Sequence, residues 1–165
     1  MGDCLHFADG KYKGEDCDEQ RADSKVYAAK SDADDCVDVP GTSSTYYEPT
    51  SKGGRNWYCI GDKDLDLTKA INGINTDECI VVNGSAAAEK SPCDASGSRP
   101  VLKVLKNVSK ISVGAASGNE FFPNECVSKG AKGTELTYSW GLEDEGPNPI
   151  QSLSWDRVLC LGSKA

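Results

Sequence analysis

The chain has 165 residues, with 26 acidic against 18 basic side chains and a net charge of −8. This length suits one mid-sized domain or two small ones. The acidic balance disfavours nucleic acid and anionic membrane surfaces as partners, because binding either normally requires clustered Lys and Arg.

The start of the chain shows no export signal, because Gly2, Asp3 and Cys4 follow Met1 directly. No apolar run approaches the roughly 20 residues that cross a bilayer. We interpret Met1 as the first residue of a trimmed chain, and we expect any export signal or anchor to precede it.

The first sixty residues predict short strands joined by turns. Residues 4–17 resemble a hairpin with its turn at Asp9-Gly10. Residues 25–30 suit a strand, and residues 56–61 suit a closing strand. Residues 39–47 predict a turn followed by either a short helix or a strand, and the sequence leaves both open.

Residues 62–76 are too long for a bare linker. They predict a short helix with Asp66 as its N-cap, or a segment that packs across both domains. Asp62, Asp64 and Asp66 have the 1, 3, 5 spacing of calcium ligands, but Leu67 replaces the glycine that an EF-hand requires. A plain acidic linker is favoured over a weak calcium site of another kind.

The second half repeats the strand pattern with two insertions. Residues 101–113 and 157–162 suit strands, whereas residues 112–126 and 141–152 are rich in Gly, Pro, Asn and acidic residues and predict exposed loops. Because long amphipathic helical patterns are absent from the sequence, we expect a mainly β to small α+β fold.

Eight cysteines are the strongest compositional signal. Zinc sites favour closely spaced Cys pairs with His partners. Here the closest pair is Cys4 and Cys17, and the only histidine is His6. We therefore expect no metal site and no cofactor, but disulfides, an oxidising compartment and an extracytoplasmic location, secreted or anchored at the cell surface.

The cysteines form two sets of four with matching surroundings. The first two cysteines of the sets, Cys4 with Cys17 and Cys79 with Cys93, are 13 and 14 positions apart. Similar segments follow in the same order, which indicates a tandem duplication. We predict two disulfide-stapled domains of similar fold, residues 1–61 and 77–165, with residues 62–76 between them.

Within each set the repeat leaves three pairings if both domains pair alike. We favour the sequential one, because it ties the two arms of each predicted hairpin and then joins the later segment to the closing strand. The predicted disulfides are Cys4–Cys17, Cys36–Cys59, Cys79–Cys93 and Cys126–Cys160.

At these residues the chain resembles an actinobacterial family of exported proteins, the LppU-type lipoproteins and their septum-formation-related relatives. The resemblance lies in Gly2-Asp3-Cys4, Cys17-Asp18, the Cys36, Gly41-Thr42, Tyr46 stretch, and Trp57-Tyr58-Cys59-Ile60. The second copy departs at Asp77-Glu78-Cys79, which lacks the opening glycine. The resemblance implies export, often with an upstream membrane or lipid anchor, and supplies no catalytic residues.

The sequence offers little catalytic chemistry. His6 alternates with Leu5 and Phe7, which predicts the solvent face of a strand. Neither a nucleophile elbow nor a glycine-rich phosphate loop occurs in the sequence. Most aromatic residues are expected in the core, and the candidates for an exposed contact are Phe121, Phe122 and Trp140.

We therefore expect a non-enzymatic, extracytoplasmic binding or scaffolding pair of domains that contacts protein or cell-envelope material. One alternative is a secreted hydrolase with a carboxylate pair, which requires two converging carboxylates, one of raised pKa. The other is a protease inhibitor that presents the loop of residues 143–150.

Overall fold

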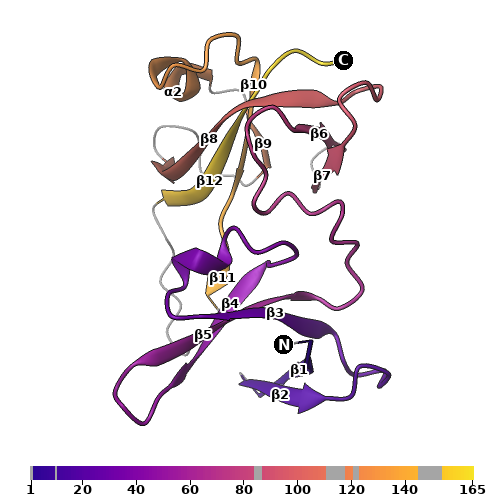
Figure 1. Ribbon diagram of the computed structural model, residues 1–165, viewed down its shortest axis with the longest axis vertical. Helices are drawn as coiled ribbons and strands as arrows, with labels where there is room; N and C mark the ends of the chain where they lie inside the picture. Colours follow the sequence, from indigo (N-terminus) through magenta and orange to yellow (C-terminus); the bar gives the residue numbers. More distant parts are fainter. Residues whose placement is uncertain (1, 10, 84–86, 111–117, 121–122, 145–153) are drawn as a thin grey trace. The chain divides into compact units, whose positions relative to one another are not determined.

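The computed structural model describes all residues except 1, 10, 84–86, 111–117, 121–122 and 145–153. The described residues are mainly β, as predicted, and form two compact units (Figure 1). Unit 1 comprises Met1–Gly73 and Leu142–Gln151, and unit 2 comprises Ile74–Gly141 and Ser152–Ala165. In the described part of the chain, no helix is long and apolar enough to cross a membrane.

Unit 1 contains a six-stranded sheet, among the described residues, in the order β11-β4-β5-β3-β1-β2. All neighbours are antiparallel except the two-residue strand β11, which runs parallel to β4. The sequence left open whether the turn in residues 39–47 is followed by a short helix or a strand, and the structure has a strand there, β4. The elements are β1 (Cys4–Ala8), β2 (Lys11–Glu15), β3 (Ser24–Lys30), the 3₁₀ helix η1 (Asp34–Cys36), β4 (Ser44–Pro49), β5 (Arg55–Asp62) and β11 (Glu143–Asp144).

Unit 2 repeats this order. Its sheet runs β7-β6-β8-β12-β10-β9 in the described residues, and all pairs are antiparallel. Strand by strand, β6, β7, β8, β10 and β12 correspond to β1, β2, β3, β4 and β5. The elements are β6 (Cys79–Val82), β7 (Ala88–Ser91), β8 (Arg99–Ser109), β9 (Gly118–Glu120), α2 (Pro123–Ser128), β10 (Leu136–Trp140) and β12 (Ser154–Leu161).

The registers of the two sheets also agree. Cys4 lies opposite Lys25, and Cys79 lies opposite Pro100 at the equivalent place. A register shift follows Val26 in the β3–β5 pair, and the β8–β12 pair has its shift at the equivalent position, opposite Cys160 and Leu161. Because bulges bend and twist a strand locally, we expect β3 and β8 to bend at equivalent places.

An equivalent tyrosine in each unit contacts the strand at the far end of the sheet, β2 in unit 1 and β7 in unit 2. In unit 1 the Tyr46 ring of β4 lies 5.6 Å from the Tyr12 ring of β2. In unit 2 the Tyr138 hydroxyl of β10 accepts a hydrogen bond of 3.2 Å from the backbone N–H of Ala88 on β7. Each tyrosine therefore contributes to the packing of its own unit.

Four disulfides form with the predicted sequential pairing: Cys4–Cys17, Cys36–Cys59, Cys79–Cys93 and Cys126–Cys160. The second disulfide of each unit is fully buried, whereas Cys17 and Cys93 of the first disulfides are exposed. The buried disulfides join η1 to β5 and α2 to β12. Each therefore holds a helical element against one face of the sheet in its unit.

Residues 63–76 form consecutive turns and not the predicted short helix. Asp66 accepts hydrogen bonds from the backbone N–H and the hydroxyl of Thr68, which closes a turn. The buried Asn72 amide donates to the carbonyls of Val37 and Thr42 at 2.9 and 3.1 Å. This packing explains why unit 1 extends to Gly73, beyond the predicted boundary at residue 61.

The other difference from the predicted boundaries lies in the insertion at residues 141–152. Its segment Leu142–Gln151 belongs to unit 1, although the prediction placed it in the second domain. The physical reason is the pairing of Glu143 and Asp144 with Ser44 and Thr45 of β4. In chain order, β10 belongs to unit 2, β11 is an edge strand of the unit 1 sheet, and β12 belongs to unit 2 again.

Candidate binding surface

The predicted contact residues do not come together in the described structure. Phe121 and Phe122 lie outside the described residues. Trp140 ends β10 with its ring half-buried and 6.2 Å from the Tyr138 ring. The indole nitrogen of Trp140 is enclosed and has no hydrogen-bond partner in the described part of the chain. Trp140 is therefore part of the packing of β10.

His6 lies on β1 and is half-buried. Its Nδ1 atom is 3.5 Å from a carboxylate oxygen of Asp23, which is at the limit of a hydrogen bond and leaves the nitrogen without a well-formed partner. All eight cysteines are in disulfides, so no thiolate is available to act as a nucleophile with His6.

The aspartates at residues 62–66 support turns. Asp62 accepts a hydrogen bond of 2.9 Å from the backbone N–H of Asp64, and Asp66 is held by Thr68. In the described residues no group of three or more His, Cys, Asp or Glu side chains is arranged to hold a metal ion.

Three described carboxyl groups have a displaced pKa, and all are displaced downward. Hydrogen bonds are the main cause: from the side chain of Thr68 to Asp66, from the backbone of Asn75 to Glu78, and from the side chain of Ser163 to Glu135. A general acid in a hydrolase needs a pKa displaced upward. These three groups therefore suit structural roles.

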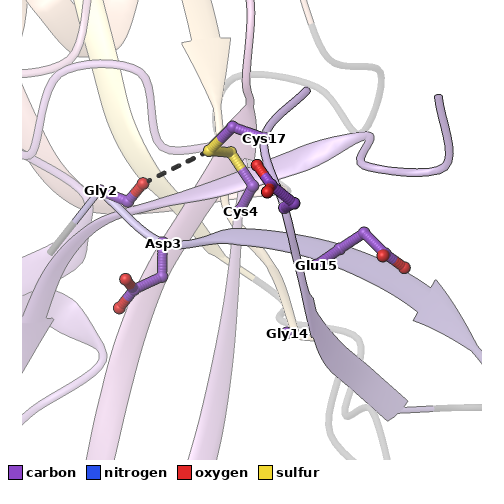
Figure 2. Close-up of a pocket in the computed structure, with 7 residues that line it drawn as sticks. Gly2, Asp3, Cys4, Gly14, Glu15 and Cys17 are labelled. Atoms are coloured by element: carbon purple, nitrogen blue, oxygen red, sulfur yellow. Dashed lines mark hydrogen bonds between the residues drawn. A yellow bond between two sulfur atoms is a disulfide. The ribbon is translucent and has the colours of Figure 1, made fainter. Parts of the chain in front are cut away.

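A recess of about 520 Å³ lies beside the Cys4–Cys17 disulfide, lined by Gly2, Asp3, Cys4, Gly14, Glu15, Asp16 and Cys17 (Figure 2). Figure 2 shows the side chains of Asp3 and Glu15 pointing away from one another. The Gly2 carbonyl oxygen is 3.7 Å from Sγ of Cys17, and a disulfide sulfur carries no proton to donate. Asp3 and Glu15 therefore do not form a converging carboxylate pair in this recess.

The β4–β5 hairpin carries a better candidate, which we call the aromatic face: Tyr47, Arg55 and Trp57. Tyr47 lies directly opposite Trp57, and their ring centroids are 5.1 Å apart. Arg55 precedes Trp57 by two residues, so it lies on the same face, and its guanidinium carbon is 4.6 Å from the Tyr47 ring centroid. The two rings are half-exposed, and Arg55 is exposed.

The position of this hairpin explains its exposure. β3 ends at Lys30, opposite Trp57, so the hairpin continues past β3 from Arg55 to its turn. Lys30 adds a second positive charge beside the aromatic rings, because residues directly opposite on neighbouring strands share a face. The aromatic face thus combines rings and cations in a chain whose net charge is −8.

The opposite face of the same hairpin is different. Tyr58 donates a hydrogen bond of 3.1 Å to Glu48, and Tyr46 packs against Tyr12. Burial and Glu48 together raise the pKa of the Tyr58 phenol, with burial the larger cause. Tyr46 and Tyr58 are half-exposed as well, but this face carries the acidic Glu48 where the aromatic face carries Arg55.

The equivalent positions in unit 2 are core. Because Thr45 opposite Cys59 corresponds to Thr137 opposite Cys160, Tyr47 and Trp57 correspond to Ser139 and Val158. Ser139 and Val158 are 1% and 0% exposed. Val158 belongs to a cluster with Cys126 of α2, whereas the much shorter η1 stands in the place of α2 in unit 1.

The sequence contains one signal for this face, although Tyr47 and Trp57 are not among the predicted contact residues. Alternation along a strand through residues 55–57 places Arg55 and Trp57 on one side, and Tyr58 on the other. What the sequence lacked was evidence that the helical cover on this side, η1, is only three residues long.

No protein-family model, curated protein or solved structure matches the chain. Evidence on function therefore comes from the geometry of the described residues.

Proposed function

We propose that the chain is an extracytoplasmic, non-enzymatic binding module of two stapled domains, in which the aromatic face of unit 1 contacts a protein or cell-envelope partner. The main observation in support is that Tyr47 and Trp57 are half-exposed, whereas the residues at the equivalent positions of unit 2 are buried in its core. Trp, Tyr and Arg are the residues that most often dominate binding energy at interfaces.

Two further observations support this proposal. Four intramolecular disulfides are typical of an oxidising environment outside the cytoplasm. The resemblance to LppU-type exported proteins favours the actinobacterial cell envelope as the place of binding. An anchor upstream of the two domains fits this location.

Co-sedimentation with insoluble cell wall from an actinobacterium tests the proposal. We compare Trp57→Ala with Tyr58→Ala, because these neighbours on β5 point to opposite faces. Trp57→Ala should lower the affinity at least about tenfold, as loss of an interface hot spot does. Tyr58→Ala should sediment like the parent chain.

Cell wall treated with protease separates the two partner classes. Binding that survives the treatment indicates a glycan partner, and binding that is lost indicates a protein. The proposal is wrong if the parent chain sediments with neither preparation, or if Trp57→Ala and Tyr58→Ala bind equally.

A further inference from the structure

The aromatic face of unit 1 is small and has clear limits. Toward the centre of the sheet it ends at Thr45 and Cys59, the next pair on the same side, which are 4% and 0% exposed. Toward the tip of the hairpin it ends at Arg55, because the chain turns between Thr50 and Gly54. At about 3.4 Å per residue and about 4.8 Å between strands, β4, β5 and β3 give this face roughly 7 Å of length and roughly 10 Å of width.

This size favours a glycan over a folded protein as the partner. A stable protein interface covers about 800 Å² on each side, several times the area of this face. A sugar ring has a flat side of C–H groups, which packs against the electron-rich face of an aromatic ring. A polysaccharide also offers the same ring many times along one chain, so many weak contacts add to firm attachment.

Two positive charges accompany the rings. The guanidinium carbon of Arg55 is 4.6 Å from the Tyr47 ring centroid, and Lys30 lies directly opposite Trp57 on the neighbouring strand. In the part of the chain that the structure describes, neither Arg55 nor Lys30 belongs to an ion pair. Because salt screens exposed charges beyond about 8 Å, the local cations act more strongly on a ligand here than the net charge of −8 does.

We propose that the aromatic face binds a polysaccharide whose sugars carry carboxylates. A carboxylate attached to a sugar ring lies at the edge of that ring, so a sugar stacked on Trp57 or Tyr47 brings its carboxylate toward Lys30 or Arg55. Arg55 is suited to this contact, because a guanidinium holds a carboxylate with two parallel hydrogen bonds. This inference rests on the proposed function for its site and names the class of ligand.

The direct test titrates the ¹⁵N-labelled parent chain with soluble probes and follows the indole N–H signals by NMR. Hexagalacturonate and a hyaluronate hexasaccharide carry carboxylates on sugars, maltohexaose is neutral, and hexaglutamate carries carboxylates without sugars. An acidic hexasaccharide should shift the Trp57 signal and bind at least about tenfold more tightly than maltohexaose or hexaglutamate. The Trp140 and Trp155 signals should not shift, because the Trp140 indole nitrogen is enclosed and Trp155 is only 7% exposed.

Two charge variants separate the local cation from the overall charge. Arg55→Gln and Lys11→Gln each remove one positive charge, but Lys11 lies on β2, two strands beyond β3 in the sheet. Arg55→Gln should weaken binding of the acidic hexasaccharide about tenfold, the loss of a charge-assisted contact. Lys11→Gln should bind it like the parent chain. Equal binding by the two variants would overturn the proposal.

The titration of the parent chain also decides the proposal without any variant. The proposal is overturned if neither acidic hexasaccharide shifts the Trp57 signal, or if maltohexaose binds as tightly. It is likewise overturned if hexaglutamate binds as tightly, in which case the ligand is an acidic protein segment.

The outcomes also separate this inference from the proposed function. Sedimentation with cell wall that depends on Trp57 but is lost after protease treatment keeps the binding module and overturns the polysaccharide. Binding of an acidic hexasaccharide by a chain that does not sediment with cell wall keeps the ligand class and contradicts the cell-envelope location.

Discussion

Units 1 and 2 are two versions of one scaffold, and they differ where the chain adds or omits a cover. Both have the same strand order, the same bulge and two disulfides in equivalent places. In unit 2, α2 and β9 cover a sheet face and a sheet edge. In unit 1 the shorter cover leaves Tyr47 and Trp57 half-exposed. A duplicated scaffold can thus keep its framework while only one copy presents a surface.

The cores differ in the same direction. The large side chains that are fully buried in unit 2 include Ile80, Val101, Val158, Leu159 and Leu161, whereas in unit 1 only Ile60 is of this kind among the described aliphatic residues. A small domain with a modest core depends on its staples. Unit 1 should therefore depend on its disulfides more than unit 2 does.

The largest expected effect comes from removing a buried disulfide. Replacing Cys36 and Cys59 with Ala should cost about 3 to 4 kcal/mol of loop-closure stabilisation, enough to unfold unit 1. Replacing Cys126 and Cys160 should destabilise unit 2 by a similar amount but leave it folded, because its aliphatic core remains. Amide NMR spectra of the two double variants show which signals disperse. Loss of unit 2 but not of unit 1 would contradict the comparison of the cores.

The next effect concerns equivalent glycines on β5 and after β12. A Cβ atom at Gly61 would lie 1.8 Å from the Gly41 carbonyl oxygen, whereas at Gly162 the nearest atom is Cγ of Pro100 at 3.0 Å. Gly61→Ala must therefore move backbone and should cost about 3 kcal/mol, at the upper end of overpacking effects. Gly162→Ala should cost about 1 kcal/mol. Urea unfolding measures both, and equal losses would contradict the difference.

A smaller effect is expected at the first turn of each unit. Gly2 and Asp77 occupy equivalent positions, with φ of 91° and 74°. A side chain in this left-handed region is strained, although Asp tolerates it better than most residues. Asp77→Gly should raise stability by about 0.5 kcal/mol, and Gly2→Asp should lower it by a similar amount. Thermal unfolding tests the pair, and a loss of stability in Asp77→Gly would show that the Asp77 side chain has a role of its own.

The smallest effect is acid sensitivity in unit 2. Hydrogen bonds, chiefly from Asn75 to Glu78 and from Ser163 to Glu135, hold the pKa of each carboxyl below the ordinary value of 4.5. A lowered folded-state pKa gives stability that is present above the unfolded-state pKa and is lost as pH falls through the folded-state pKa.

Glu78→Gln and Glu135→Gln should therefore reduce stability at neutral pH and have little effect at a pH below the folded-state pKa of each carboxyl, where the parent side chains are protonated too. Urea unfolding of each variant at the two pH values measures this. A penalty that is the same at both pH values would show that the ionised carboxylates contribute nothing. Both side chains are largely solvated, so the effect should be small.

The framework was predictable because cysteine spacing reports covalent constraints directly. The four disulfides and the hairpin with its turn at Asp9 follow from local sequence patterns. The edge strands β9 and β11 were not predictable, because both lie in insertions whose Gly, Pro, Asn and acidic residues are typical of loops. Their pairing depends on distant strands and not on their own propensity.

The same reasoning applies to the site. Asn72 in the predicted linker is buried because two carbonyls of unit 1 accept its amide protons, which no local pattern shows. Tyr47 and Trp57 were read as core because small β domains bury most aromatic residues. Their half-exposure results from the short η1. The length of η1 cannot be predicted from the sequences of β4 and β5, on which Tyr47 and Trp57 lie.

Hydrogen exchange at two equivalent amides in the free parent chain tests the central claim most directly. Tyr47 and Ser139 occupy equivalent positions on β4 and β10. Because the Thr50 N–H donates to the Gly54 carbonyl, the alternation of antiparallel pairs turns the Tyr47 N–H away from β5, toward the outer edge of the sheet. Among the described residues, only Ser139 pairs with a strand on that outer edge. We predict that the Tyr47 amide exchanges at least about tenfold faster than the Ser139 amide, because no described strand pairs with β4 at Tyr47 on that edge. Equal protection of the two amides would show that the β4 edge is closed within the chain itself, and would contradict the account of unit 1 as the copy that presents a binding surface.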